Sequence, residues 1–385
     1  MSTRSITFLQ PNRLTFGNGC LAEALTYLAA LASRRIQIVH SPSLTAVVDR
    51  MKEALFIAGC SVTTNPVPAG EPTISAFNSA LAHARAANPA CIVGIGGGSA
   101  LDLAKLLAAF VRNDQRIEDT FGIGLLASRN CHLVCIPSTS GTGSEVSPNA
   151  ILLDETAQLK KGVISPHLVP DAAFIDPTLT HSVPAAVTAY TGLDALTHCI
   201  EAYTNRFAHP LVDLYALEGI ALCARFLCRA VRNPTDAEAR ESMARASLYG
   251  GLCLGPVNTA AVHALAYPLG GEFHLPHGLS NAVLLPAVFR FNAEASPERH
   301  ADVAHALGVA PQPTPLQTAL AGAEQLEHLT RDCGIDTNLT HHGPDRSTIP
   351  HLAAAAMTVQ RLLRNNPREI THADAEFLYA QCFRQ

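Results

Sequence analysis

Asp194 and His198 stand four residues apart in the run TGLDALTH, and His263 and His277 follow later in the chain. A spacing of four residues places two side chains on one face of a helix, so we expect Asp194 and His198 to bind the same ion. One carboxylate and three imidazoles suit Fe(II) or Zn(II) far better than Mg(II) or Ca(II). The chain holds 17 histidines, and a single histidine is more often a surface or core residue than a ligand. The four residues therefore predict a transition-metal site only as a set.

Two loops rich in glycine and hydroxyl groups each follow a short apolar run. The first, residues 96–99 (GGGS), comes directly after CIVGI and before a helical pattern. Glycines at a strand-to-helix turn let the backbone approach a ligand closely, and the amides at the start of a helix favour a pyrophosphate. A tight turn that needs positive φ explains the same residues, and the run is not the GxGxxG fingerprint. This loop alone leaves both interpretations open.

The second loop, residues 137–145 (PSTSGTGSE), follows the apolar run HLVCI and holds five hydroxyl side chains and two glycines. Hydroxyls and free amides suit contacts to phosphate, ribose and a nicotinamide carboxamide. A solvated loop is the alternative, but this one lies between two apolar runs. Open α/β sheets bind ligands at the carboxyl ends of their strands, so we expect both loops at that edge of one sheet.

Short β-type runs alternate with helical patterns in the first half of the chain. We expect strands over 36–40, 61–65, 91–95 and 132–136, and helices over 44–58, 74–87 and 99–111. Strands separated by helices of this length favour a parallel sheet, because parallel neighbours need a long connection.

Long helical stretches rich in Ala and Leu begin near Pro184. Gly and Pro predict interruptions of these helices at 233–234, 250–251, Pro268 and Pro286. Four prolines from Pro166 to Pro184 mark the change of pattern. We therefore expect an α/β dinucleotide-binding domain over 1–182 and a helical metal-binding domain over 183–385.

The composition excludes several classes of protein. A chain of 385 residues with 48% hydrophobic content buries a large core, and a net charge of −5 without a run of Lys and Arg gives no footprint for nucleic acid. The 11 cysteines are scattered without a CxxC pair, which is typical of a reducing compartment. The first residues lack the apolar stretch of a secretory signal, and no later run approaches the ~20 apolar residues that span a bilayer. We expect a cytoplasmic protein without membrane contact.

Five blocks of the chain resemble the iron-containing, or group III, alcohol dehydrogenase family: GGGSALDLAK (96–105), PSTSGTGSEVSPNAIL (137–152), LVPDAAFIDPTLT (168–180), TGLDALTHCIEAY (191–203) and HALAYPLGGEFHLPHGLSNAVLLP (263–286). They stand in the family's order and spacing and run across most of the chain. The resemblance implies a Rossmann-like N-terminal α/β domain and an all-α C-terminal domain, the dehydroquinate synthase-like superfold. It also implies hydride transfer between NAD or NADP and a small alcohol or carbonyl compound, in a homodimer or larger homo-oligomer.

The same resemblance assigns roles to individual residues. It implies that the metal, Fe(II) or Zn(II), is held by Asp194, His198, His263 and His277. It implies that Gly97, Gly98, Ser99 and Asp102, in and just after the glycine loop (residues 96–99), contact the pyrophosphate of the cofactor. It implies further contacts from Ser138, Thr139 and Thr142 of the second loop (residues 137–145), called the hydroxyl loop below, and from Lys160 near the ribose. A catalytic metal of this kind acts as a Lewis acid on the substrate oxygen and lowers the pKa of the alcohol, so that hydride leaves for the nicotinamide.

Two positions depart from the family pattern. Many members carry a histidine four residues after the third ligand, for proton relay or nicotinamide contact, whereas this chain has Tyr267. A phenol still donates and relays through water, and a packing role is the alternative. At the end of the expected strand 36–40, NAD-preferring members often have an aspartate that repels the 2′-phosphate of NADP, and this chain has Ser41. The repelling charge is absent, so NADP is not excluded.

Other functions stay open on the sequence alone. A maleylacetate reductase-like, dehydroquinate synthase-like or glycerol dehydrogenase-like enzyme shares the superfold, but the intact four-ligand set counts against the first. A noncatalytic metal- or nucleotide-binding protein is the more distant alternative, although only the Tyr267 exchange alters a predicted site residue. Oxidation of NADH and NADPH with aldehydes, semialdehydes and oxoacids, after loading with Fe(II) or Zn(II), separates these alternatives.

Overall fold

The computed structural model describes residues 4–68 and 70–383. The chain divides into two compact units, an α/β unit of residues 9–139 and 143–182 and a helical unit that begins its main part at residue 183. Residues 4–8 and 140–142 group with the helical unit. The main division therefore falls in the proline-rich segment where the sequence pattern changes. The two short segments precede this division in the chain but belong to the helical unit.

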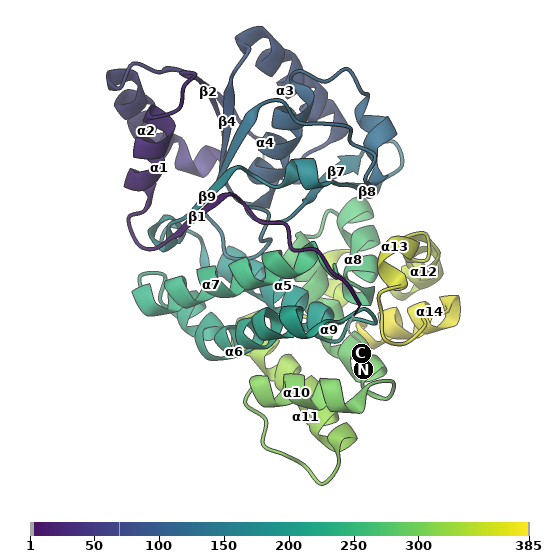
Figure 1. Cartoon of the computed structure of the whole chain (residues 1–385). Helices are drawn as coiled ribbons and strands as arrows, with labels where there is room; N and C mark the ends of the chain where they lie inside the picture. Colours follow the sequence, from purple (N-terminus) through teal and green to yellow (C-terminus); the bar gives the residue numbers. More distant parts are fainter. Residues whose placement is uncertain (1–3, 69, 384–385) are drawn as a thin grey trace. The chain divides into compact units, whose positions relative to one another are not determined.

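The α/β unit is built on a six-stranded sheet in the order β1-β9-β6-β4-β2-β3, and all of its described strand pairs are parallel (Figure 1). Its strands are β1 (Arg13–Phe16), β2 (Arg35–His40), β3 (Ser61–Pro66), β4 (Cys91–Gly96), β6 (His132–Pro137) and β9 (Ala172–Ile175). Its helices are α1 (Leu21–Ala29), α2 (Thr45–Ile57), α3 (Ile74–Ala87) and α4 (Gly98–Phe110). The expected parallel sheet is confirmed. Strands β1 and β9 and helix α1 were not predicted from the sequence.

Side chains of the central strands alternate between two cores. Ile92 and Leu133 pack with α3 and α4, whereas Val93 and Val134 pack with α1 and α2. Every residue of β4 is buried, as expected for a parallel strand covered on both faces. Gly94 interrupts this apolar run because a Cβ there would come within 2.8 Å of the Ala104 Cβ on α4. The close approach places the start of α4 directly after β4.

A second, three-stranded sheet in the order β5-β8-β7 was not predicted from the sequence. It contains β5 (Gly122–Ile123), β7 (Asn149–Asp154) and β8 (Leu159–Ile164), and β7 pairs with β8 antiparallel. β7 and β8 have six residues each and are joined by the exposed turn of residues 155–158.

Lys105 fastens this small sheet and the hydroxyl loop to α4. Its fully buried ammonium group donates to the carbonyl oxygens of Ser144 (2.9 Å), Ser147 (2.8 Å) and Asn149 (2.5 Å). One turn earlier on α4, the Asp102 carboxylate accepts from Ser144 Oγ at 2.5 Å. Burial lowers the pKa of Lys105 against the opposing charge of Asp102. Two residues of the GGGSALDLAK block therefore hold the scaffold around the loop.

The helical unit wraps around α5, which is buried over most of its length. Its helices are α5 (Ala185–Tyr203), α6 (Pro210–Arg232), α7 (Ala237–Leu254), α8 (Ala261–Glu272), α9 (His277–Ala293), α10 (Pro297–Ala306), α11 (Pro315–Asp332), α12 (Ile349–Ala356), α13 (Gln360–Leu363) and α14 (His372–Gln381). Helices α6, α7 and α9 pack directly on α5 (Figure 1). The predicted helical domain is confirmed.

Only one of the predicted helix interruptions is confirmed, the one at 233–234 between α6 and α7. The interruption at 250–251 is wrong, because both glycines lie inside α7. A Cβ on Gly250 would lie 3.1 Å from the His198 Cβ, so the glycine lets α7 approach α5 at a predicted metal ligand. Pro268 and Pro286 also lie inside helices, α8 and α9, where both are buried. Tertiary packing there outweighs the lost backbone hydrogen bond of each proline.

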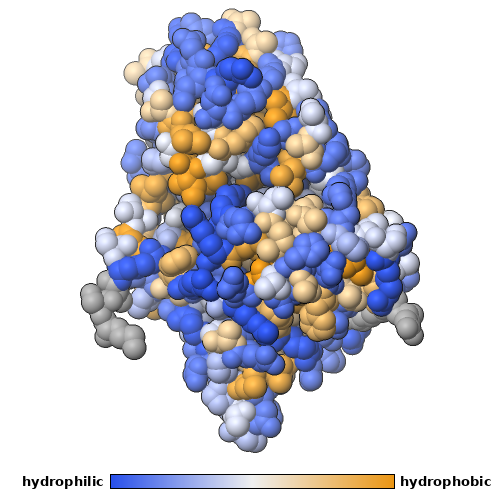
Figure 2. Space-filling view, turned by 90° about the vertical axis from the view of Figure 1, so that its right-hand side faces the viewer, coloured by the Kyte–Doolittle hydropathy of each residue, from blue (hydrophilic) through white to orange (hydrophobic). Residues whose placement is uncertain are grey.

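The described residues include no helix that is both long enough and apolar enough to cross a membrane. Figure 2 shows one face of the molecule, on which hydrophobic residues are interspersed among hydrophilic ones without a continuous apolar band.

Replacing Lys105 with Met is expected to lower the free energy of unfolding by roughly 3–5 kcal/mol, because the carboxylate of Asp102 and three carbonyls lose their buried partner. Urea unfolding followed by circular dichroism measures the change. Lys52→Met, at an exposed position on α2, is the matched control and should change stability by no more than about 0.5 kcal/mol. Equal effects of the two variants would contradict the role of Lys105.

Candidate metal centre and cofactor loops

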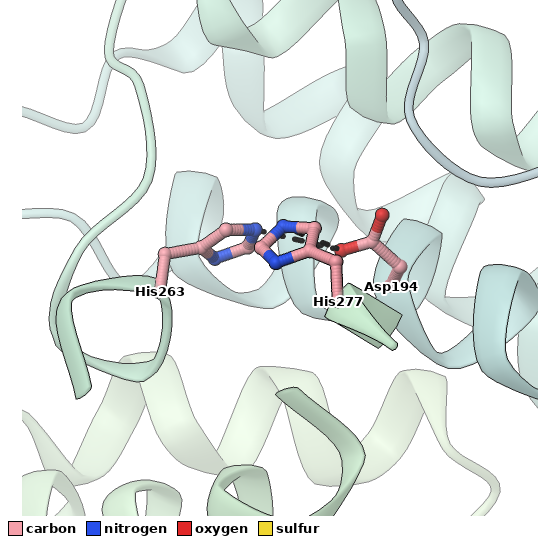
Figure 3. A group of neighbouring side chains, drawn as sticks. All are labelled: Asp194, His263 and His277. Carbon is pink, nitrogen blue, oxygen red and sulfur yellow. Dashed lines mark ion pairs between the residues drawn. The ribbon is translucent and has the colours of Figure 1, made fainter. Parts of the chain in front are cut away.

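Three of the predicted metal ligands converge in the helical unit from three different helices. Asp194 lies on α5, His263 on α8, and His277 is the first residue of α9. The Asp194 Oδ1 atom is 3.5 Å from His263 Nε2 and 3.7 Å from His277 Nε2, and the three atoms lie within 4.8 Å of one another. Figure 3 shows the three side chains, with dashed lines that join the imidazoles to the Asp194 carboxylate. Donor atoms this far apart match a single ion bound at about 2.0–2.2 Å from each.

His198 joins this group through Asp194. It lies one turn later on α5, and its Nε2 atom is 3.7 Å from the same Oδ1 atom. Its ring stacks on the His263 ring with centroids 4.8 Å apart and an angle of 15° between the planes. The mutually close set nevertheless consists of Asp194, His263 and His277, with His198 outside it. All four predicted ligands meet at one carboxylate oxygen, and His198 is the least closely joined.

Asn281 is a site residue that the sequence argument missed. Its Nδ2 atom donates to Asp194 Oδ1 at 2.7 Å and lies 3.2 Å from His263 Nε2 and 3.4 Å from His277 Nε2. One amide NH2 group thus lies within hydrogen-bond distance of all three ligand atoms, so those atoms converge on a single region. A cation requires this convergence, and the donor set therefore fits Fe(II) or Zn(II). The spacing of four residues from His277 on one helix was the available signal.

Glu201 is the second missed residue, and it fixes the orientation of His263. Its carboxylate accepts from His263 Nδ1 at 2.6 Å, from the Ala260 amide at 3.0 Å and from the Val262 amide at 2.6 Å. With Nδ1 as the donor, the Nε2 lone pair of His263 is directed at the ligand group. A carboxylate behind a metal-binding imidazole raises its basicity and holds its ring in place. Glu201 also satisfies two amides at the start of α8 that have no partner within the helix.

The electrostatics of the cluster favour a cation. Burial raises the pKa of Asp194, but the charges of His198, His277 and His263 outweigh it and hold this pKa well below its usual value. Burial lowers the pKa of His263, but Glu201 and Asp194 together raise it to about 10. Among the described residues, neither buried carboxylate forms an ion pair with Lys or Arg. Within the described part of the chain, imidazoles are therefore the only ion-pair partners of the two carboxylates, which leaves a demand for positive charge.

Tyr267 lies one turn after His263 on α8 and is 6% exposed. Its ring centroid is 6.2 Å from that of His277, and its hydroxyl oxygen accepts from Arg361 Nη2 at 3.0 Å. The phenol therefore stands beside a ligand histidine and is engaged by a guanidinium. The proton-relay role of Tyr267 stays a prediction.

The predicted cofactor residues of the α/β unit gather at the carboxyl ends of three neighbouring strands. Ser41 follows β2, the glycine loop follows β4, and Ser138 follows β6. The Gly97 amide donates to Ser41 Oγ at 3.3 Å, and the Ser138 amide donates to the Gly96 carbonyl at 2.8 Å. Thr139 lies beside the glycine loop, 3.5 Å from the position of a Cβ on Gly97. Gly98 opens α4, so the free amides of a helix start lie at this edge.

Several other predicted cofactor residues have partners within the scaffold. Asp102 accepts from the Ile151 amide at 2.9 Å as well as from Ser144, and Ser99 Oγ donates to the Gly70 carbonyl at 2.9 Å. The buried Lys160 on β8 forms an ion pair with Glu71 at 2.7 Å. These contacts show how the side chains are held, and their contact with a dinucleotide stays a prediction.

Thr142 belongs to the part of the hydroxyl loop that groups with the helical unit, together with residues 140 and 141. Gly141 explains why this part needs a glycine, since a Cβ there would lie 2.9 Å from the Thr191 Cα. The loop was predicted to contact a ligand. Its glycine in addition serves close packing on the first turns of α5.

Glu145 at the end of the same loop is a buried acid that the sequence argument passed over. Burial raises its pKa to about 7, and the charge of Lys105 only partly offsets this. The carboxyl group therefore changes protonation near neutral pH inside the loop scaffold.

Known proteins match this chain over almost its whole length. Two family models match, "Iron-containing alcohol dehydrogenase" over residues 11–177 and "Fe-containing alcohol dehydrogenase family, C-terminal" over residues 188–383. Long-chain-alcohol dehydrogenase 1 of Geobacillus thermodenitrificans is 38% identical, over 100% of this chain and 98% of that protein.

Solved structures of other proteins also superpose on nearly the whole chain. The crystal structure of a 1,3-propanediol oxidoreductase superposes with a TM-score of 0.94 at 32% identity and covers 99% of this chain and 100% of that one. The sulfoacetaldehyde reductase of Bifidobacterium kashiwanohense, solved in complex with NAD+, superposes with a TM-score of 0.86 at 26% identity, over 98% of this chain and 99% of that one.

Glu201→Gln is expected to weaken metal binding by about 10–100-fold, because an amide accepts less strongly from His263 Nδ1 and no longer favours the tautomer with a free Nε2. Titration of the metal-free protein with Zn(II) in competition with a chromogenic chelator measures the affinity. Glu218→Gln, at an exposed position on α6, is the control. A folded Glu201→Gln protein with the affinity of the wild type would disprove the positioning role.

The Glu145→Gln variant is expected to gain stability over the wild type when the pH is raised from 5 to 8. The folded state raises the pKa of Glu145 from 4.5 to about 7, so its contribution to stability is complete below pH 4.5 and is lost as the pH rises through 7. The amide cannot lose a proton, so the difference in unfolding free energy between wild type and variant should shift by roughly 2 kcal/mol between the two pH values. Urea unfolding at both pH values tests this, with the exposed Glu53→Gln as control. A shift of the opposite sign would refute the assignment.

Proposed function

The chain belongs to the iron-containing alcohol dehydrogenase family, and we propose that it interconverts a small alcohol and its aldehyde with a metal held by Asp194, His198, His263 and His277. The observation that carries this proposal is the convergence of three imidazole Nε2 atoms on one buried carboxylate oxygen. In the balanced reaction, alcohol and NAD+ give aldehyde, NADH and one proton. Hydride passes between the substrate carbon and C4 of the nicotinamide.

Residues of the helical unit around the metal position have different roles. A bound Fe(II) or Zn(II) supplies Lewis acidity toward the substrate oxygen. Glu201 keeps the Nδ1 proton on His263, and so keeps the Nε2 lone pair available. Asn281 supplies the polar group that faces the same three ligand atoms. Burial of these groups keeps bulk water from screening their charges.

The α/β unit is proposed to bind the dinucleotide at the carboxyl ends of β2, β4 and β6. The amides of Gly98 and Ser99 at the start of α4 suit the pyrophosphate, and the hydroxyl loop suits the ribose and carboxamide. Ser41 stands after β2 without a negative charge, so a 2′-phosphate meets no repulsion there. We therefore propose NAD as the cofactor, with NADP also accepted.

Location and assembly are further proposals. We expect the protein to act in the cytoplasm, from its scattered cysteines, and as a homodimer or larger homo-oligomer, from the family resemblance. Gel filtration with light scattering tests the assembly directly.

Replacing His263 or His277 with Ala is expected to abolish metal binding and to lower kcat/KM by on the order of 1,000-fold, since the Lewis acid contributes several kcal/mol. Elemental analysis of the purified variants and NADH oxidation with short aldehydes measure the two effects. His305→Ala, at an exposed position on α10, should keep both metal and turnover. Full turnover in a metal-free variant would overturn the proposed function.

A further inference from the structure

Arg361 on α13 is a half-buried cation placed next to the ligand cluster. Its Nη2 atom donates to the Tyr267 hydroxyl at 3.0 Å, and its guanidinium carbon is 5.9 Å from the centre of the Tyr267 ring. The same ring also lies near His277, with centroids 6.2 Å apart. Helices α13 and α8 lie side by side (Figure 1). The guanidinium and a predicted metal ligand are thus both neighbours of one aromatic ring.

The charge of Arg361 is not neutralised within the part of the chain that the structure describes. No carboxylate there forms an ion pair with it, in contrast to Arg129, Arg299 and Arg368. The buried Arg240 also lacks a carboxylate partner, but it donates to two carbonyl oxygens and a hydroxyl group. Among the described residues, the guanidinium of Arg361 donates to a neutral phenol oxygen, which accepts one hydrogen bond and leaves further N–H groups available. A partly buried guanidinium without a counter-ion keeps hydrogen-bonding capacity and charge for an anion.

From this arrangement we infer that Arg361 and Tyr267 form an anion subsite that binds the far end of the substrate. The ligand class is a short aldehyde or alcohol that carries a carboxylate or sulfonate group. The planar fork of Arg361 matches such an oxyanion with two parallel hydrogen bonds. Tyr267 holds the guanidinium in place. This inference rests on the proposed function for the position of the reacting oxygen, near the ligand cluster, and adds the charge at the opposite end.

The exchange at position 267 takes part in this subsite. The phenol oxygen of Tyr267 accepts the hydrogen bond that orients Arg361. The family resemblance leads us to expect an imidazole here, which presents a shorter side chain and, when protonated, no acceptor to a guanidinium. The same substitution that leaves the proton relay open therefore supplies the anchor of the anion subsite.

The test compares two aldehydes of equal chain length, 4-oxobutanoate and butanal, with NADH and the metal-loaded protein. Arg361→Gln is expected to lower the ratio of their kcat/KM values at least about 10-fold, mainly through KM for 4-oxobutanoate, because a charged hydrogen bond is lost. Arg361→Lys should restore part of the ratio, since it keeps the charge without the fork. Arg364→Gln, exposed one residue beyond the end of α13, is the control and should leave the ratio unchanged. An unchanged ratio in Arg361→Gln overturns the inference.

A binding measurement separates this inference from the proposed function. Calorimetric titration of the metal-loaded wild type with 4-hydroxybutanoate, and with 1-butanol for comparison, reports the subsite without turnover. Binding of 4-hydroxybutanoate that weakens at least about 10-fold in Arg361→Gln supports the anion subsite even if neither aldehyde is reduced, and in that case only the proposed function fails. Equal binding of 4-hydroxybutanoate to wild type and variant overturns the subsite, whatever the turnover.

Discussion

The carboxylate of Glu201 is the interaction on which the metal centre depends. It joins α5 to the start of α8 by accepting from two backbone amides and from the ring of His263. One buried group thereby satisfies the helix terminus, sets the tautomer of a ligand and fixes the distance between the helix of Asp194 and that of His263. Because the acceptor is ionised and buried, its loss would leave donors on α8 unpaired. Fold and site are coupled at this point.

Close helix packing is the second condition for the ligand cluster. Gly250 lets α7 approach α5 beside His198. A Cβ on Gly278, at the start of α9, would overlap the backbone of Tyr190 on α5. Both glycines are adjacent in space to predicted ligands, where a side chain would push the helices apart. Local propensity disfavours glycine inside a helix by about 1 kcal/mol. Positioning of the ligand side chains explains why these positions keep glycine despite that preference.

The sequence predicted what depends on short-range patterns. The strands around residues 36–40 and 91–95, the parallel sheet and the pairing of Asp194 with His198 follow from spacings within a few residues. The wrong interruptions at 250–251 and Pro268 arose because a local rule ignored the neighbouring helix. Glu201 and Asn281 were missed for a related reason.

Such missed residues act through partners that are distant in the chain. The amide of Asn281 meets Asp194, 87 residues away, and Arg361 meets Tyr267, 94 residues away. No periodicity in one segment reports such a pair. The three imidazoles and Asp194 were recognisable only because the resemblance joined their segments. Contacts that the family pattern does not specify become visible only in the folded chain.

The helical unit holds groups of opposite charge that do not form an ion pair with one another. Asp194 and Glu201 are buried carboxylates, and a half-buried guanidinium stands nearby, yet Arg361 pairs with neither. The ring of Tyr267 is a neighbour of both groups, with its centroid 5.9 Å from the guanidinium carbon of Arg361 and 6.2 Å from the ring centroid of His277. A direct ion pair would neutralise the carboxylate that attracts the cation and the guanidinium that attracts an anion. In the proposed anion subsite, the phenol takes the place of a carboxylate partner and leaves the charge of Arg361 for the anionic end of the substrate.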